Sequence, residues 1–133
     1  MIRYALSYLA AAATFLVLDM AFLTFSVGRV YKPHIGHLMA DKVALGPAAA
    51  FYLIYIAAIL LLAIIPAAKS GSWGQLLTSA AIFGFAAYAT YDLTNQATLK
   101  GWSSFVTVVD LAWGTFVTTA AASAGYLVAR HTR

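Results

Sequence analysis

The stretch PAAAFYLIYIAAILLLAIIPAA, residues 47–68, decides the fold class because it contains no charged residue. Its length falls within the ~17–25 residues that an α-helix needs to cross the hydrocarbon core of a bilayer. Pro47 favours a helix start at this point, since proline in the first helical turn gives up only a backbone donor that has no partner there. The stretch therefore predicts a transmembrane helix.

The rest of the chain has a similar composition. Hydrophobic residues make up 63% of the 133 positions and charged residues only 9%, whereas soluble domains contain about a quarter charged residues. Further apolar runs cover residues 4–28, 73–99 and 103–129, and the first is too long for the ~7–15-residue core of a signal peptide. We therefore expect an all-α integral membrane protein, an antiparallel four-helix bundle that forms a single domain over residues 1–133.

The charged residues lie mostly outside these runs. A polar connector at residues 29–46 could form a short helix on the membrane surface or an ordered loop. The Lys and Arg residues flank the apolar runs, so we interpret them as anchors to membrane lipids and expect no nucleic-acid partner. They divide equally between the two sides, which leaves the orientation undecided: Arg3, Lys69, Arg130 and Arg133 against Arg29, Lys32, Lys42 and Lys100.

A polar face interrupts the third apolar run. Five side chains capable of hydrogen bonding recur there at helical spacing and share one face of the predicted helix. They are Tyr88, Tyr91, Asp92, Asn95 and Gln96. We interpret this face as one wall of a buried site, with Gln96 and Lys100 at its mouth.

Three of the four acidic residues lie inside predicted spans: Asp19, Asp92 and Asp110. Counting ~1.5 Å per residue from the side with the long connector places all three ~13–15 Å below that interface, with Tyr52 and Tyr55 at a comparable depth. An acid facing lipid costs ~2.5–3.5 kcal/mol, so these carboxyl groups should face inward and mark a functional site. Because carboxyl groups held close together cannot all ionise, we expect at least one to carry a proton at neutral pH.

The third and fourth spans carry a specific motif, Tyr91-Asp92-Leu-Thr-Asn95-Gln-Ala-Thr-Leu-Lys100-Gly-Trp102, followed by Asp110-x-x-Trp113-Gly114. Together with Leu18-Asp19, the motif resembles the signature of a bacterial family of four-span predicted membrane proteins, domain-of-unknown-function family 2177. The chain departs from that pattern at Ser103, where proline is expected. The resemblance covers nearly the whole chain. It implies the four-span fold and singles out the same residues, and it brings no assigned activity. We expect the protein to lie in the bacterial inner membrane.

Three functions stay open. Polar groups that converge inside an apolar bundle are typical of a protein that binds or transports a small molecule or lipid, here with a proton link, and transport would require a homodimer. A membrane-embedded enzyme acting on a lipid would use Asp92 or Asp110 as general acid or base. The third hypothesis is a structural or assembly subunit of a membrane complex. The predicted ligand-binding or proton-relay residues are Asp19, Tyr55, Tyr88, Tyr91, Asp92, Asn95, Asp110 and Trp113.

The expected ligand is small and either hydrophobic or anionic. The aspartates and Asn95 are hard oxygen ligands that would suit Mg²⁺ or Ca²⁺. However, no paired-His or Glu-x-x-His pattern lies within the spans, and the chain contains no Cys. We therefore predict no metal and no cofactor.

Overall fold

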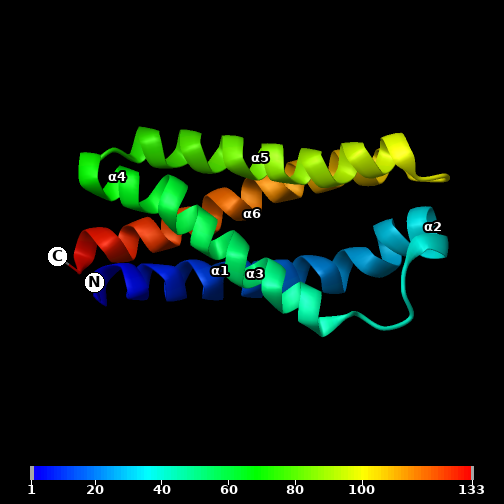
Figure 1. Cartoon of the computed structure of the whole chain (residues 1–133), viewed down its shortest axis with the longest axis horizontal. Coiled ribbons are helices and arrows are strands. Elements are labelled where there is room, and N and C mark those ends of the chain that lie inside the picture. Colours follow the sequence, from blue (N-terminus) through cyan, green and yellow to red (C-terminus); the bar gives the residue numbers. More distant parts are fainter. Residues whose placement is uncertain (1, 133) are drawn as a thin grey trace.

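The computed structural model describes residues 2–132, and these residues form helices and connecting turns without a β-strand. Four helical segments are long and apolar enough to cross a membrane: Ile2–Leu38, Leu45–Ser70, Trp73–Thr98 and Ser104–His131. Successive segments run in opposite directions, and both termini lie at the same end (Figure 1). The predicted all-α, four-span fold is confirmed.

The first segment is longer than expected. It consists of α1 (Ile2–Ser26), a π-helical turn η1 (Val27–Tyr31), α2 (Lys32–Ile35) and a 3₁₀ turn η2 (Gly36–Leu38). Within the predicted polar connector at 29–46, residues 29–38 are therefore helical and continue the first segment, and residues 39–44 are irregular. Pro33 explains the difference, because its ring would clash with the carbonyl four residues earlier in a straight α-helix. A wider turn just before the proline relieves that clash, so the helix bends and continues.

The second segment repeats this arrangement. It consists of α3 (Leu45–Ile59), a π-helical turn η3 (Leu60–Ile64) and α4 (Ile65–Ser70). Pro66 lies at the start of α4, as Pro33 lies at the start of α2, and in both places the π turn comes directly before. The segment begins two residues before the predicted start. It ends at Gly71, which adopts a φ of 70° and donates its N–H to the Ala67 carbonyl at 2.8 Å, a common way to close a helix.

The last two helices, α5 (Trp73–Thr98) and α6 (Ser104–His131), both begin with a serine cap. Ser72 Oγ accepts a hydrogen bond from the Gln75 N–H at 3.0 Å, and Ser103 Oγ accepts one from the Val106 N–H at 3.3 Å. A serine cap satisfies a backbone donor that the helix leaves free. Ser103, where the resemblance leads us to expect proline, therefore caps the start of α6.

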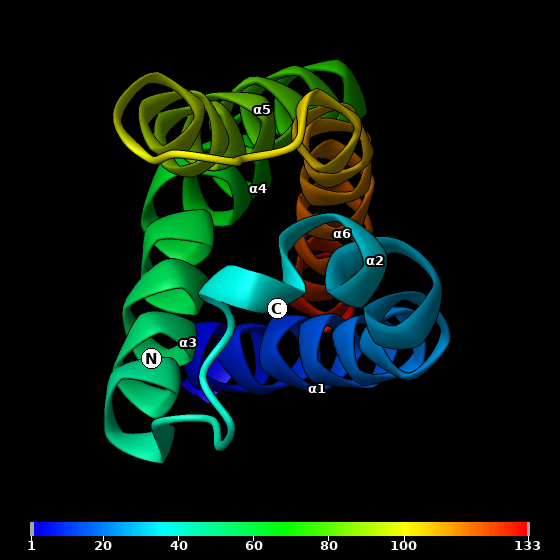
Figure 2. The same cartoon turned by 90° about the vertical axis from the view of Figure 1, so that its right-hand side faces the viewer.

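The four segments surround the long axis of the molecule as the sides of a square (Figure 2). Helix α6 contacts α1 on one side and α5 on the other, while η3 and α4 lie against α5 and α6. The first half of the second segment behaves differently, because α3 contacts α1 and diverges from α5. This divergence leaves room between α3 and α5.

Small residues bring α5 and α6 close together. A Cβ atom added to Gly84 would lie 2.7 Å from the Gly114 carbonyl oxygen and 2.7 Å from Thr118 Cβ. Ala80 and Ala122 are buried at the same helix pair. The Ala80-x-x-x-Gly84 and Gly114-x-x-x-Thr118-x-x-x-Ala122 patterns thus form the close-packed contact that small residues permit between membrane helices.

Replacing Gly101 by alanine should destabilise the protein by about 1–2 kcal/mol, because an L-residue pays roughly this much in the left-handed region. Gly101 has a φ of 76°, and an added Cβ would also lie 2.7 Å from Nε2 of His37. Unfolding in mixed micelles of SDS and dodecyl maltoside measures the loss. In a His37→Ala background the loss should shrink without vanishing, since only the clash is removed. Wild-type stability of the Gly101→Ala variant would contradict the turn geometry.

Candidate functional site

Three aspartates from different helices are buried between the segments. Asp19 on α1 is 9% exposed, Asp110 on α6 is 7% exposed and Asp92 on α5 is fully buried. The same helices expose large apolar side chains on their outer faces, including Val17, Leu93 and Val108. The carboxyl groups therefore face the interior of the bundle.

Asp19 has both of its oxygen atoms satisfied. Oδ1 accepts a hydrogen bond from Trp113 Nε1 at 3.1 Å, and Oδ2 accepts one from the Tyr52 hydroxyl. The Trp113 ring stacks on Phe22 with 4.1 Å between ring centroids and an angle of 5°. Asp19 thus connects α1 to α3 and to α6.

Asp110 has a partner that the sequence did not reveal. The Tyr31 hydroxyl, from the η1 turn, donates a hydrogen bond to Asp110 Oδ1. The Tyr31 ring also lies edge-on to Phe22, with 6.3 Å between centroids. Sequence reasoning placed Tyr31 in the connector. Extending the α-helical spacing would not have found it either, because a π turn inserts an extra residue and shifts the helical phase.

Asp92 has an unusual environment. No N–H or O–H group of residues 2–132 donates a hydrogen bond to either of its oxygen atoms, and its carboxyl group lies within hydrogen-bonding reach of Asp110. Carboxylates only accept hydrogen bonds, so two carboxyl groups can bond to each other only when one of them carries a proton. A proton shared between Asp92 and Asp110 would therefore give both carboxyl groups a hydrogen bond.

Basic side chains of the described part of the chain take no part in this cluster. Within residues 2–132, the donors to Asp19 and Asp110 are tyrosine and tryptophan, and Asp92 has the carboxyl group of Asp110 beside it. Arg29, the nearest base along the first segment, instead donates to the Phe25 carbonyl at 2.9 Å and lies over the Phe25 ring. The same residues contain no group of three His or Asp side chains placed to hold a metal ion. The cluster is thus acidic and has no internal counter-charge.

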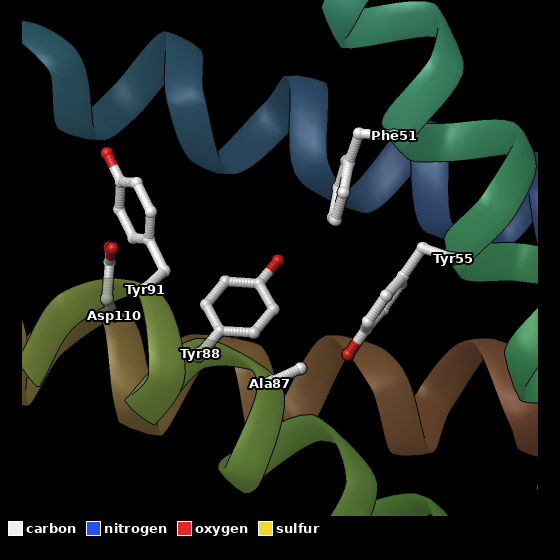
Figure 3. Close-up of a pocket in the computed structure, with 6 residues that line it drawn as sticks. All are labelled: Phe51, Tyr55, Ala87, Tyr88, Tyr91 and Asp110. Carbon is white, nitrogen blue, oxygen red and sulfur yellow. The ribbon is translucent and has the colours of Figure 1, made fainter. Parts of the chain in front are cut away.

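A pocket of about 400 Å³ lies between α3 and α5 and reaches α6. In Figure 3, Asp110 and Tyr91 stand at one end and Phe51 and Tyr55 at the other, with the Tyr88 hydroxyl pointing into the space between them. The pocket is lined by Phe51, Tyr55, Ala87, Tyr88, Tyr91 and Asp110.

Gly114 lets the Tyr88 ring take this position. The ring fills the space in which a Gly114 Cβ would otherwise lie, directly against the backbone of α6. Any larger residue at 114 would push the ring away from α6 and into the pocket. The Trp113-Gly114 pair of the motif therefore serves two contacts, because the tryptophan bonds Asp19 and the glycine seats Tyr88.

Tyr55 lines the pocket, but it does not join the carboxyl groups. Its hydroxyl shares a hydrogen bond of 2.7 Å with Thr118 Oγ1, two helical turns along α6 from Asp110, and its ring stacks on Phe83. Because α3 crosses the other helices at an angle (Figure 1), a count of residues along α3 does not give the same depth as a count along α6.

The remaining predicted residues lie nearer the α5–α6 turn. Tyr91 is 55% exposed and meets Trp102 edge-on, and Asn95 is half-buried one turn further along. Gln96 donates to Ser104 Oγ at 2.9 Å and accepts from Thr107 Oγ1 at 2.8 Å. Both ends of its amide thus hold α6 to α5, and Gln96 is not among the pocket-lining residues. Lys100 is exposed in the turn and is not a pocket-lining residue.

Comparison with known proteins agrees with this architecture. No curated protein and no solved structure matches the chain. A family model described as a predicted membrane protein, DUF2177, matches residues 4–127. That match runs from the first turn of α1 to the last turns of α6 and includes all three buried aspartates, Tyr31 and every pocket-lining residue. The chain is an integral membrane protein that belongs to the DUF2177 family.

Proposed function

We propose that this protein binds a small amphipathic molecule or a lipid in the pocket between α3 and α5. The observation that carries the proposal is the combination of aromatic walls with one buried carboxyl group, Asp110, in a single pocket. Ligand sites are typically apolar concavities with a few convergent polar groups, and their usual volumes of about 300–1,000 Å³ include that of this pocket. We further propose that the site lies inside the bilayer of the bacterial inner membrane, since helical spans are foreign to outer-membrane barrels.

The divergence of α3 from α5 supports entry of the ligand into the pocket from the surrounding lipid. Phe51 on α3 and Tyr91 on α5 are 45% and 55% exposed, and they stand on the two sides of the opening. Aromatic residues so exposed on helices of this composition would contact acyl chains. A ligand with an apolar tail could then reach Asp110 directly from the lipid phase.

The Asp92–Asp110 pair supports coupling between ligand binding and proton transfer. A ligand that bonds to Asp110 competes with Asp92 for the same oxygen atoms, so its arrival changes which group holds the shared proton. Binding and proton transfer would therefore be coupled at one site. Transport would in addition need alternating access, for which we propose a homodimer, because four segments leave a single chain little to move against.

Filling the pocket should abolish ligand retention. Ala87 lines the pocket, whereas its neighbour Ala86 is exposed on the outer face of α5. We expect Ala87→Trp to fold normally and to lose the lipid or other small molecule that co-purifies with the wild type. Ala86→Trp, the matched control, should keep it. Native mass spectrometry of the detergent-purified protein measures the bound species, and full retention by Ala87→Trp would refute the pocket as the binding site.

Asp19 supports a different role. Its two oxygen atoms are already engaged by Tyr52 and Trp113 from neighbouring segments, and it does not line the pocket. Hydrogen bonds between membrane helices stabilise their packing. We therefore propose that Asp19 holds α1, α3 and α6 together, while Asp92 and Asp110 serve the ligand.

A further inference from the structure

We infer that the ligand of this pocket is a hydrophobic cation, such as a long-chain amine or quaternary ammonium compound, whose binding displaces the proton shared by Asp92 and Asp110. The inference rests on the proposed function and names the chemical class of its ligand. It replaces the expectation of an anionic ligand, for which the pocket offers no basic partner.

The charge of the site favours a cation. Asp110 lines the pocket, Asp92 lies against it, and no Lys, Arg or His of residues 2–132 bonds to either carboxyl group. Inside an apolar bundle an unpaired charge is strongly disfavoured, so an anionic ligand would add repulsion to a site that is already acidic. A cation would instead take the place of the shared proton and leave the charge of the site unchanged.

The aromatic walls suit the same class of ligand. The rings of Phe51 and Tyr55 lie 5.1 Å apart on α3, and the Tyr88 ring from α5 stands nearly perpendicular to Tyr55, at 76° and 6.3 Å. These rings and that of Tyr91 line the same pocket as Asp110. Aromatic faces attract cations through the quadrupole of the ring, most strongly where water is excluded, and quaternary ammonium groups are the usual guests of such cages.

The exchange balances in charge. In the free protein the Asp92–Asp110 pair with one proton carries a single negative charge. When a monovalent cation binds beside Asp110 and the proton leaves, two carboxylates and one cation again sum to a single negative charge. The other titratable groups around the pair and its pocket are one carboxyl group, which accepts hydrogen bonds from two donors, and several tyrosine hydroxyl groups. Tyrosine hydroxyl groups remain protonated near neutrality. These titratable groups are Asp19 from α1, Tyr31 from η1, Tyr55 from α3, and Tyr88 and Tyr91 from α5.

The test compares three probes with the same chain length on the full chain in dodecyl maltoside: dodecyltrimethylammonium, dodecanol and dodecyl sulfate. We expect the cation to bind at least about tenfold more tightly than either of the others, the scale of one favourable ionic or cation–π contact. Calorimetric titration in two buffers of different ionisation enthalpy should show release of close to one proton per cation. Asp110→Asn should lose the preference for the cation, whereas Asp41→Asn, which removes an exposed carboxyl group of the 39–44 loop, should keep it.

A second variant keeps the test possible if Asp110→Asn does not fold. Phe51→Leu changes a rim residue that is 45% exposed, so it should fold, and it should narrow the cation preference. If the wild type binds the cation and dodecanol with equal affinity, and if Ala87→Trp weakens the binding of both, the cation inference is overturned and the pocket proposal stands. Probe binding unaffected by Ala87→Trp would overturn the pocket proposal itself. Cation binding without proton release would overturn the exchange.

Discussion

Replacing Asp19 by alanine should lower the free energy of unfolding by about 2–4 kcal/mol. The substitution leaves the Tyr52 hydroxyl and the Trp113 indole N–H without their acceptor, and each unsatisfied buried donor costs about 1–3 kcal/mol. We place the total in the lower part of the summed range because interhelical hydrogen bonds in membrane proteins average only about 0.6 kcal/mol in double-mutant cycles. Unfolding by SDS in dodecyl maltoside, followed by helical circular dichroism, measures the difference.

A double-mutant cycle shows whether the loss comes from these donors. Tyr52→Phe alone should destabilise the protein, but in the Asp19→Ala background it should cost less or even restore stability, because it removes a hydroxyl that has already lost its acceptor. Asp41→Ala, at an exposed loop position, should change stability by less than about 0.5 kcal/mol. An Asp19→Ala variant as stable as this control would rule out the proposed structural role of Asp19.

Replacing Gly84 by alanine should cost about 1–3 kcal/mol, the usual penalty for overpacking a close contact. The added methyl group would lie 2.7 Å from the Gly114 carbonyl oxygen and from Thr118 Cβ. Neither is the end of a flexible side chain, so α5 must move away from α6. The same unfolding experiment measures the loss.

Gly46 provides the matched control. It is also a helical glycine, at the start of α3, but nothing lies within 4 Å of an added Cβ. Gly46→Ala should therefore leave stability unchanged or raise it by up to about 1 kcal/mol, since alanine is the better helix former. If both glycine variants behave alike, the close approach of α5 and α6 at Gly84 is incorrect.

Much of the fold is readable from the sequence because the bilayer limits the choices. A long apolar run without charges has few conformations other than a spanning helix, and this reasoning gave four segments whose ends agree closely with the structure, except at the first connector. The inward orientation of Asp19, Asp92 and Asp110 followed from the same cost of placing a charge against lipid. These inferences need only composition and helical spacing.

The features that the sequence did not reveal depend on how helices bend and cross. The π turns before Pro33 and Pro66 change the helical phase, so Tyr31 could not be placed beside Asp110 by counting. The tilt of α3 moved the Tyr55 hydroxyl to Thr118. Gln96 on α5 bonds Ser104 and Thr107 on α6, across the turn that joins the two helices. The periodicity of one helix does not predict its contacts with the next.

If the proposed ligand enters between α3 and α5, its concentration in the membrane, and not in water, would determine how much of the protein is occupied. For a compound that enters through this opening, occupancy follows its mole fraction among the lipids, and the aqueous concentration matters only through partitioning. A compound with modest intrinsic affinity but a strong preference for the membrane would fill the site at low doses. A hydrophilic analogue would leave the site empty even if it fitted tightly.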